Sequence, residues 1–132
     1  HKEGVAAPLL FVDGNGILHP RRSGIATAVG VMAGVPTIGV GKKLLCGKVE
    51  QTGTSKTVCG LVLQDDELLG AAIRSSSTSR PIYVSPGNKV DVETAALFAT
   101  SAFRGHRLPE PLFQADALSK RAARLARIAS RI

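Results

Sequence analysis

The first residues that could carry chemistry form a turn after an apolar run. Residues 8–13 (PLLFVD) end on the acid Asp13, and Gly14-Asn15-Gly16 follows directly. An acid at the carboxyl end of a buried strand is costly to desolvate unless a cation meets it, and glycines let that partner approach the backbone. A divalent metal ion would serve. The alternative, common for an Asp-Gly pair on its own, is an Asx turn in which the carboxylate accepts backbone N–H bonds.

An imidazole and two ammonium groups follow this turn. His19 lies six residues after Asp13, and Gly41-Lys42-Lys43 follows the next apolar run. A carboxylate that holds a metal, with cations for the phosphate oxygens, suits hydrolysis of a phosphodiester, because negative charge grows there in the transition state. Taken singly, His19 is also typical of a satisfied turn histidine, and the two lysines are typical of a solvated pair.

A strand, a helix and a second strand must position these groups. Residues 8–13 predict a buried central strand, residues 24–33 a short and nearly fully buried helix, and residues 35–41 a second strand. Ser23 is expected to cap the helix and Gly34 to follow it. This order predicts a parallel crossover unit. The carboxyl ends of its strands then meet at one edge of the sheet, where catalytic loops of such sheets lie.

The middle of the chain is rich in predicted strands. Residues 57–64 and 68–74 flank Asp65-Asp66-Glu67 and predict a β-hairpin with a charged, solvated turn. Residues 81–85 (PIYVS) predict a further strand, which follows a Ser/Thr-rich loop at residues 75–79. The parallel unit is therefore followed by strands that pair through short turns.

Two helices are expected to complete the chain. Asp91 has the place of an N-cap for a helix over residues 92–103, which Gly105 closes. The last twenty residues predict a second helix, rich in Ala, Leu and Arg. No internal repeat or domain boundary separates these elements, so residues 1–132 are expected to form a single domain.

The composition excludes several classes of protein. Of the 132 residues, 44% are hydrophobic and only 4% aromatic, so the core must be aliphatic. No apolar run approaches the roughly 18–20 residues of a membrane span, and no targeting peptide is evident, so an intracellular protein is expected. Cys46 and Cys59 lack metal-site spacing and are expected as buried or free thiols. No serine lies in a GxSxG elbow, which argues against a serine hydrolase.

Basic residues gather toward the carboxyl end. From residue 104 onward there are seven cations and two acids, in a chain of net charge +7. On a helix that starts near Glu110-Pro111, one stripe holds Asp116, Lys120, Arg124, Arg127 and Arg131, and the opposite arc holds Leu118, Ala122, Leu125, Ala129 and Ile132. This pattern suits a ridge that follows phosphates with salt-sensitive affinity. The alternative is a solvated face whose cations complement the helix dipole.

Four segments together resemble one protein family. They are residues 10–22 (LFVDGNGILHPRR), 36–45 (PTIGVGKKLL), 81–88 (PIYVSPGN) and 108–116 (LPEPLFQAD). Their order and spacing resemble the endonuclease V family over nearly the whole chain. The resemblance implies a ribonuclease H-like α/β fold, a mixed sheet flanked by helices. It also implies a Mg²⁺- or Mn²⁺-dependent endonuclease that hydrolyses the second phosphodiester 3′ to inosine or deoxyinosine.

The resemblance assigns roles to individual residues. Asp13 and Asp116 match the acids of the metal site, and His19 and Lys42 match residues placed near the scissile phosphate. Further contacts to nucleic acid are expected within these segments from Asn15, Gly16, Arg22, Lys43, Gly87 and Asn88. Lys120 and Arg124 are expected to add contacts because of the basic stripe of the terminal helix, and not because of the resemblance. The implied partner is inosine-containing DNA or single-stranded RNA, bound by a protein that is monomeric when complete and does not bind membranes.

The chain also departs from the family pattern. Asn88 ends the Ser85-Pro86-Gly87-Asn88 loop where many members have His. Members carry, upstream of the DGNG strand, further strands with another catalytic Asp, a Glu and a Pro/Tyr wedge, whereas only twelve residues precede Asp13 here. The amino-terminal strands are therefore expected to be missing. The alternative function is a catalytically incomplete module from a truncated homologue that binds nucleic acid or a partner protein.

Overall fold

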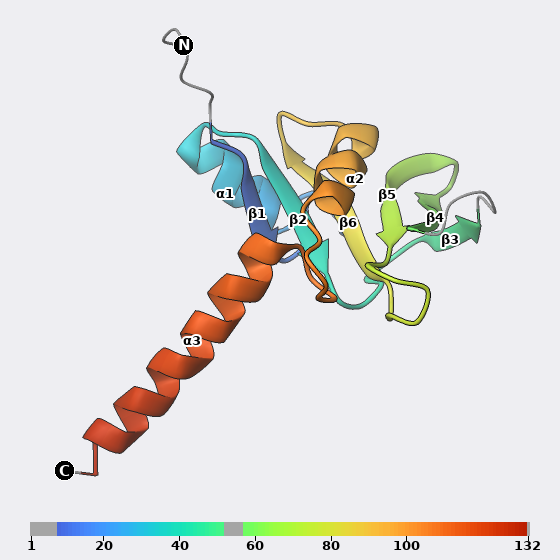
Figure 1. Cartoon of the computed structure of the whole chain (residues 1–132). Coiled ribbons are helices and arrows are strands. Elements are labelled where there is room, and N and C mark those ends of the chain that lie inside the picture. The colour runs from blue at the N-terminus through green and yellow to red at the C-terminus, as the bar shows by residue number, and fades with distance from the viewer. Residues whose placement is uncertain (1–7, 52–56, 132) are drawn as a thin grey trace, which may run out of the picture.

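The computed structural model describes residues 8–51 and 57–131 of the chain. In this part, six strands form one mixed sheet in the order β1-β2-β6-β5-β4-β3. The strands are β1 (Leu10–Asp13), β2 (Thr37–Gly41), β3 (Lys48–Gln51), β4 (Val58–Gln64), β5 (Glu67–Ile73) and β6 (Ile82–Asn88). The helices are α1 (Ile25–Ala33), α2 (Val92–Ser101) and α3 (Glu110–Ala129). Figure 1 shows α1 and α2 packed beside the sheet and α3 projecting from it, which confirms the predicted α/β class.

The predicted parallel crossover unit is confirmed. β1 and β2 run parallel, with Asp13 opposite Val40, and α1 connects them. The prediction that β1 is a buried central strand is wrong, because among the described strands it pairs only with β2 and lies at the sheet edge. Leu10 and Asp13 at its two ends are exposed. An apolar run reports the environment of the side chains and does not reveal whether both backbone edges are paired.

The predicted cap and burial of α1 are both wrong. Gly24, and not Ser23, is the N-cap, and no side chain caps the helix. Instead, the Asn15 carbonyl in the preceding loop accepts a hydrogen bond from the Ala26 N–H at 3.0 Å. A backbone carbonyl thus satisfies an N–H group of the first turn that a cap side chain would otherwise satisfy. Only Ala26 and Gly30 are buried, whereas Met32 is 87% exposed. A single helix on a sheet buries one stripe only. Gly34 takes the expected left-handed conformation after the helix (φ 69°).

The predicted hairpin is confirmed as β4 and β5. The two strands pair antiparallel, and Asp65 and Asp66 between them have φ of 52° and 67°. Positive φ at both central residues is typical of two-residue hairpin turns, because the backbone twist of such a turn matches the twist of the two strands that it joins. Strand β3 was not predicted, because its sequence KVEQ is polar and only Val49 is half-buried. Such an edge strand has the composition of a loop.

Asp91 caps α2 as expected. Its carboxylate accepts a hydrogen bond from the Thr94 N–H at 2.7 Å, and the hydrogen bonds from Thr94 lower the pKa of Asp91. The predicted end at Gly105 is wrong, because the helix stops at Ser101 with Ala102 as its C-cap. Gly105 instead takes a positive φ in the connector to α3. Strand β6 continues to Asn88, three residues beyond the predicted end.

The core is aliphatic, as the composition requires. Its main cluster joins the central strands to the buried stripe of α2, with Ile38, Val40, Ala71, Ile73, Ile82, Val84, Ala95 and Ala99 among its members. Burial of each large aliphatic side chain contributes about 1.5–3 kcal/mol. Cys46 and Cys59 are free, as predicted.

The predicted terminal helix is confirmed as α3, but it packs on the domain only through its first turns. Leu112 is its one buried residue among those described, and every described residue after Asp116 is exposed. Figure 1 shows the rest of α3 running away from the sheet. No helix in the described ranges has both the length and the apolar character needed to cross a bilayer.

Candidate active site

The Asp13–Gly16 turn packs against β2 and β6, which are neighbours in the sheet. The Gly14 N–H donates to the Val40 carbonyl at 2.9 Å, and the Gly16 N–H donates to the buried Ser85 hydroxyl at 2.9 Å. The next residue, Ile17, donates its N–H to the Pro86 carbonyl at 2.8 Å. Hydrogen bonds donated to β2 and β6 thus hold the turn against the sheet.

Close backbone packing explains the glycines of this turn. A Cβ at Gly16 would overlap the Pro86 carbonyl oxygen and lie 2.8 Å from the Gly87 nitrogen. A Cβ at Gly39 would lie 2.5 Å from the Gly16 nitrogen and 2.6 Å from the Gly14 oxygen. Because these neighbours are backbone atoms, they cannot move aside as a flexible side chain would. The glycines therefore let the turn lie flat on β2 and β6.

Asp13 and Lys42 come from neighbouring strand ends. Asp13 closes β1 opposite Val40, and Lys42 follows the last residue of β2. Both residues are exposed, and in the described part of the chain neither side chain has a hydrogen bond or an ion pair. A carboxylate and an ammonium group are thus available to a ligand at this edge of the sheet.

Arg107 holds the backbone of Lys42 and was not predicted. One guanidinium nitrogen, Nη2, donates to the Lys42 carbonyl at 3.2 Å and to the Pro81 carbonyl at 3.0 Å. Partial burial lowers the pKa of Arg107, with Arg80 adding to the effect, but a guanidinium remains charged at neutral pH. The sequence carries no signal for this role, because the contact with Lys42 joins residues 65 positions apart.

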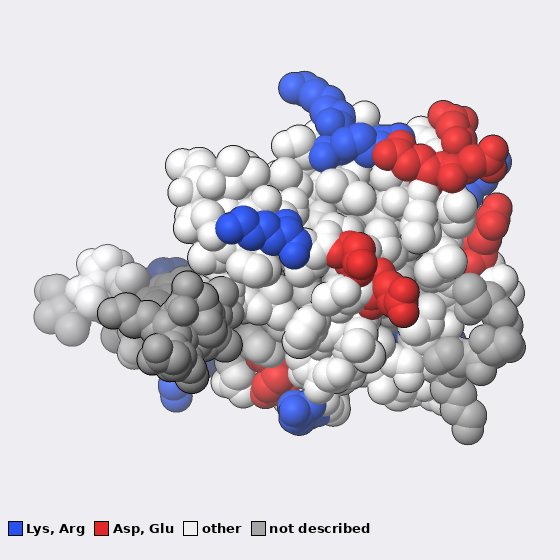
Figure 2. All heavy atoms as spheres, turned by 90° about the horizontal axis from the view of Figure 1, so that it is seen from above, with Lys and Arg blue, Asp and Glu red and all other residues white. Residues whose placement is uncertain are grey.

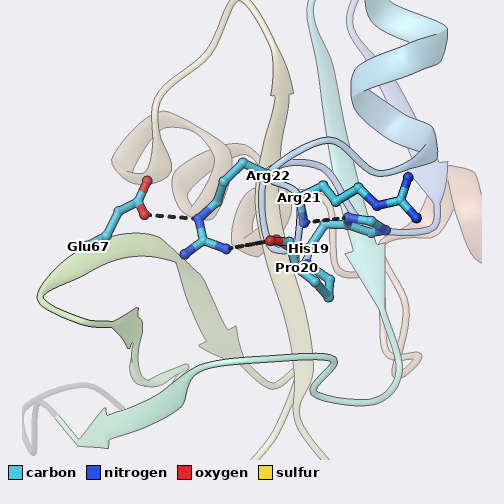
Figure 3. Close-up of polar contacts among 5 residues, drawn as sticks. All are labelled: His19, Pro20, Arg21, Arg22 and Glu67. Carbon is cyan, nitrogen blue, oxygen red and sulfur yellow. Dashed lines mark hydrogen bonds and ion pairs between the residues drawn. The ribbon is translucent and has the colours of Figure 1, made fainter.

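His19 and Arg22 form a compact loop after the turn (Figure 3). The His19 Nδ1 accepts a hydrogen bond from the Arg21 N–H at 3.1 Å, so in the neutral ring the proton lies on Nε2. Arg22 has a positive φ of 59° and donates to the His19 carbonyl at 2.9 Å. The Arg22 guanidinium also pairs with Glu67 at 2.9 Å, so this loop is anchored to the start of β5.

The donors available for a metal ion are oxygen atoms. The Asn15 Oδ1 is buried without a hydrogen-bond partner in the described part, and Asp116 on α3 pairs with Lys120 at 3.0 Å. Hard cations such as Mg²⁺ prefer carboxylate and amide oxygens, so Asp13, Asn15 and Asp116 fit in kind. Among the described residues, no group of three or more His, Cys, Asp or Glu side chains is gathered for a metal. The protein ligands that the fold supplies here are therefore few.

The helix that carries Asp116 lies beside the strand that ends on Asp13. α3 contacts β1, and its first turns are fixed by a stacked pair, His106 and Phe113, with ring centroids 3.4 Å apart. His106 also hydrogen-bonds Glu110 at 2.9 Å. Hydrogen bonds from Gln114 and His106 lower the pKa of Glu110. The helix that carries Asp116 is thereby anchored beside the strand that carries Asp13.

The predicted nucleic-acid contacts on β6 have structural partners. The Asn88 amide nitrogen donates to the Gly30 and Val35 carbonyls, both at 3.0 Å, and so ties the end of α1 to β6. A Cβ at Gly87 would overlap the Thr37 hydroxyl. Lys43, by contrast, is exposed beside Lys42. Contacts of these three residues with nucleic acid remain predictions.

Replacing Ser85 by Ala should destabilise the turn. The substitution removes the only acceptor that the described structure gives the Gly16 N–H, and an unsatisfied buried donor costs about 1–3 kcal/mol. Urea denaturation should therefore show a lower free energy of unfolding for Ser85→Ala. The control is Ser119→Ala on the exposed face of α3, which should change stability by less than about 0.5 kcal/mol. Equal stability of the two variants would contradict the assigned hydrogen bond.

Comparison with known proteins identifies the family. The sequence model described as Endonuclease V matches residues 2–117, which include the turn, both strand ends and Asp116. The chain belongs to the endonuclease V family. A protein named Endonuclease V from Azotobacter vinelandii is 44% identical over 115 residues, which are 87% of this chain and 52% of that protein.

Solved endonuclease V structures share the fold. The Endonuclease V from Streptomyces avermitilis superposes with a TM-score of 0.79 at 36% identity, over 89% of this chain and 52% of that one. An endonuclease V D234N variant from Ciona intestinalis, crystallised with DNA containing an inosine followed by a ribo-adenosine, gives 0.74 at 28% identity, over 89% and 55%. The chain thus spans about half the length of the endonuclease V proteins that it matches.

Proposed function

We propose that this chain forms part of an endonuclease that hydrolyses the second phosphodiester 3′ to inosine or deoxyinosine in a nucleic-acid strand. Membership of the endonuclease V family supports the reaction class, and the inosine-containing DNA bound by the Ciona intestinalis relative supports the substrate. The observation that carries the proposal is Asp13. Its carboxylate is exposed and unpaired within the described residues, at the strand end next to Lys42.

Asp13 and Asp116 would hold Mg²⁺ or Mn²⁺. Asn15, in the same turn as Asp13, would offer its amide oxygen. Such an ion, when bound, makes water a stronger nucleophile and stabilises charge on the phosphate. The role of this chain's own residues is to present carboxylate oxygens from two anchored elements, the turn and α3. The hydrogen bonds of Gly14 and Gly16 fix the backbone of the turn that carries Asp13.

Lys42 and His19 would act on the phosphate. The Lys42 ammonium group is free to contact a non-bridging oxygen, where its charge stabilises the negative charge that grows during hydrolysis. His19 would donate a hydrogen bond from Nε2, because its Nδ1 already accepts from Arg21. In this arrangement the neutral imidazole is a donor to the phosphate or the leaving oxygen and does not abstract a proton from water.

Cleavage of a labelled, inosine-containing oligonucleotide tests the proposal. The protein as the gene encodes it should, with Mn²⁺ or Mg²⁺, produce a single cut directly after the 3′ neighbour of inosine, at the second phosphodiester, and the matching adenosine strand should stay intact. Cutting at several positions, or equal cutting of the adenosine strand, would refute it.

Lys42→Ala should slow cleavage far more than it affects folding. Loss of one charged contact to the transition state costs about 10²–10³-fold in rate. The melting temperature should change little, because the Lys42 side chain is exposed and has no partner in the described part. Lys48→Ala, on the far edge strand β3, is the matched control and should keep full activity. A rate loss in Lys42→Ala that tracks a loss of folded protein would remove Lys42 from the mechanism.

A second candidate function is a catalytically incomplete module that binds nucleic acid or a partner protein. It is favoured by the small number of metal-ligating side chains that the described residues gather. Under this alternative, the protein binds the inosine strand in a salt-sensitive manner and does not cut it with either metal ion. The cleavage assay above therefore separates the two functions.

A further inference from the structure

The second half of α3 carries cations that the domain does not neutralise. We name Lys120, Arg121, Arg124 and Arg127 the α3 cations; all four are exposed. Lys120 pairs with Asp116, whereas the three arginines have no ion pair or side-chain hydrogen bond in the part of the chain that the structure describes. They also line an open hollow of about 650 Å³ along the helix. Four positive charges are thus presented together.

Three of the α3 cations form a row along one face of the helix. Lys120, Arg124 and Arg127 follow each other at helical spacings of four and three residues, so they lie on one face and span about 10 Å along the axis. Figure 1 shows α3 leaving the domain from beside the end of β1, where Asp13 lies. A strand held at the candidate active site could therefore continue along this face.

The face of the molecule shown in Figure 2 offers a contrast. On the face shown in Figure 2, Lys and Arg side chains lie among Asp and Glu side chains, with uncharged surface between them. Elsewhere in the fold, Arg22 is neutralised by Glu67. On α3, the only acid near the cations is Asp116. On this face, therefore, cations and acids are interspersed, whereas on α3 four cations lie near a single acid.

This arrangement is unfavourable for the isolated helix. Like charges three or four residues apart destabilise a helix by about 0.2–0.5 kcal/mol per pair, and the α3 cations include Lys120 with Arg124 and Arg124 with Arg127. The helix also receives no packing from the domain beyond Asp116. A polyanion bound along the cations would remove the repulsion, whereas a neutral protein partner would not.

The apolar side of α3 does not favour a membrane. After Asp116, its large apolar residues are Leu118, Leu125 and Ile128, and the rest of that side is alanine without an aromatic residue. Helices that bind in the membrane interface carry a broad face of Trp, Phe and Leu. The apolar side of α3 is therefore too small to anchor the helix in lipid. Its positive charge instead favours a negatively charged partner that is not a membrane.

From these observations we infer that the α3 cations bind the sugar-phosphate backbone of a nucleic-acid strand, independently of inosine. The family match ends at residue 117, so this surface lies outside the part of the chain that the family defines. The inference deepens the proposed function and rests on it for the identity of the polyanion, since it adds a backbone contact beyond the cleavage site. Phosphate contacts position a strand and do not read its sequence.

The test measures binding of the full chain to a fluorescent single-stranded oligonucleotide without inosine and without metal. Each lost phosphate contact on a single strand reduces the slope of log K against log salt by about 0.7, so Arg124→Gln with Arg127→Gln should reduce it by about 1.4. The matched control, Lys48→Gln with Lys89→Gln, removes the same charge at a site on β3 and at the residue that follows β6. It should leave the slope unchanged. Circular dichroism should show unchanged helix in both proteins.

The outcomes are distinct. Equal slopes for the wild-type chain and the arginine variant would overturn the inference, as would binding to anionic phospholipid vesicles without binding to the oligonucleotide. Equal slope losses in both double variants would also overturn it, since the effect would then be one of net charge. Because the probe lacks inosine, the two proposals can fail separately. If the arginine variant keeps the wild-type salt slope while the protein cleaves inosine strands, only the α3 contact is rejected. If the variant shows the reduced slope while the protein cleaves nothing, only the nuclease is rejected.

Discussion

Asp13→Asn is expected to abolish cleavage of inosine-containing strands while leaving the protein folded. The substitution keeps the size of the side chain and removes the negative charge that would hold the metal ion. Several kcal/mol of charge stabilisation depend on that ion, and each 1.4 kcal/mol is tenfold, so the cleavage rate should fall by about 1,000-fold or more. Single-turnover cleavage with Mn²⁺ in excess measures this loss directly.

Binding and stability separate a catalytic role of Asp13 from a structural one. Because the side chain is exposed and unpaired within the described residues, thermal unfolding of Asp13→Asn should match that of the wild type. Its affinity for the inosine strand without metal should be equal or higher, since one negative charge has been removed near the phosphates. Asp66→Asn, at a turn residue with positive φ that Asn tolerates well, is the control and should retain full activity. Cleavage by Asp13→Asn within tenfold of the wild type would exclude Asp13 as a metal ligand.

Gly16→Ala is expected to have the largest effect on folding. Its new Cβ would overlap the Pro86 carbonyl, and its neighbours are backbone atoms of β6 that cannot turn away. Overpacking of this kind costs about 3 kcal/mol or more, a large share of the roughly 5–15 kcal/mol by which a domain is stable. Urea denaturation should show a matching drop in the free energy of unfolding, or no folded protein at all. Displacement of the turn by the new Cβ should also break the hydrogen bond from the Gly16 N–H to the Ser85 hydroxyl.

The control for this effect is another glycine. A Cβ at Gly105 would meet no atom within 4 Å, although its φ of 89° is unfavourable for alanine. Gly105→Ala should therefore cost only about 1–2 kcal/mol, the penalty of the backbone conformation alone. If Gly16→Ala proved no less stable than Gly105→Ala, the close packing of the turn on β6 would be wrong. In that case the nucleic-acid contact predicted for Gly16 would become the better explanation of the residue.

Local features of the chain were predictable from the sequence. The Asp91 cap, the Asp65-Asp66 turn and the left-handed Gly34 depend on residues within a few positions of each other, and the structure confirms all three. The aliphatic core followed from composition in the same way. The candidate site residues Asp13 and Lys42 were found because an acid and a lysine follow two consecutive apolar strands. Parallel pairing then places both strand ends at one edge.

The tertiary structure alone decided which groups hold the site together and how deeply each element is buried. The Gly16–Ser85 and Arg107–Lys42 hydrogen bonds join residues 69 and 65 positions apart. Such partners depend on strand order and register, which a single sequence does not specify. For the same reason, the edge position of β1 and the exposed side of α1 contradicted expectations drawn from apolar runs. An apolar run states that side chains prefer to leave water, whereas the neighbours that cover them come from distant parts of the chain.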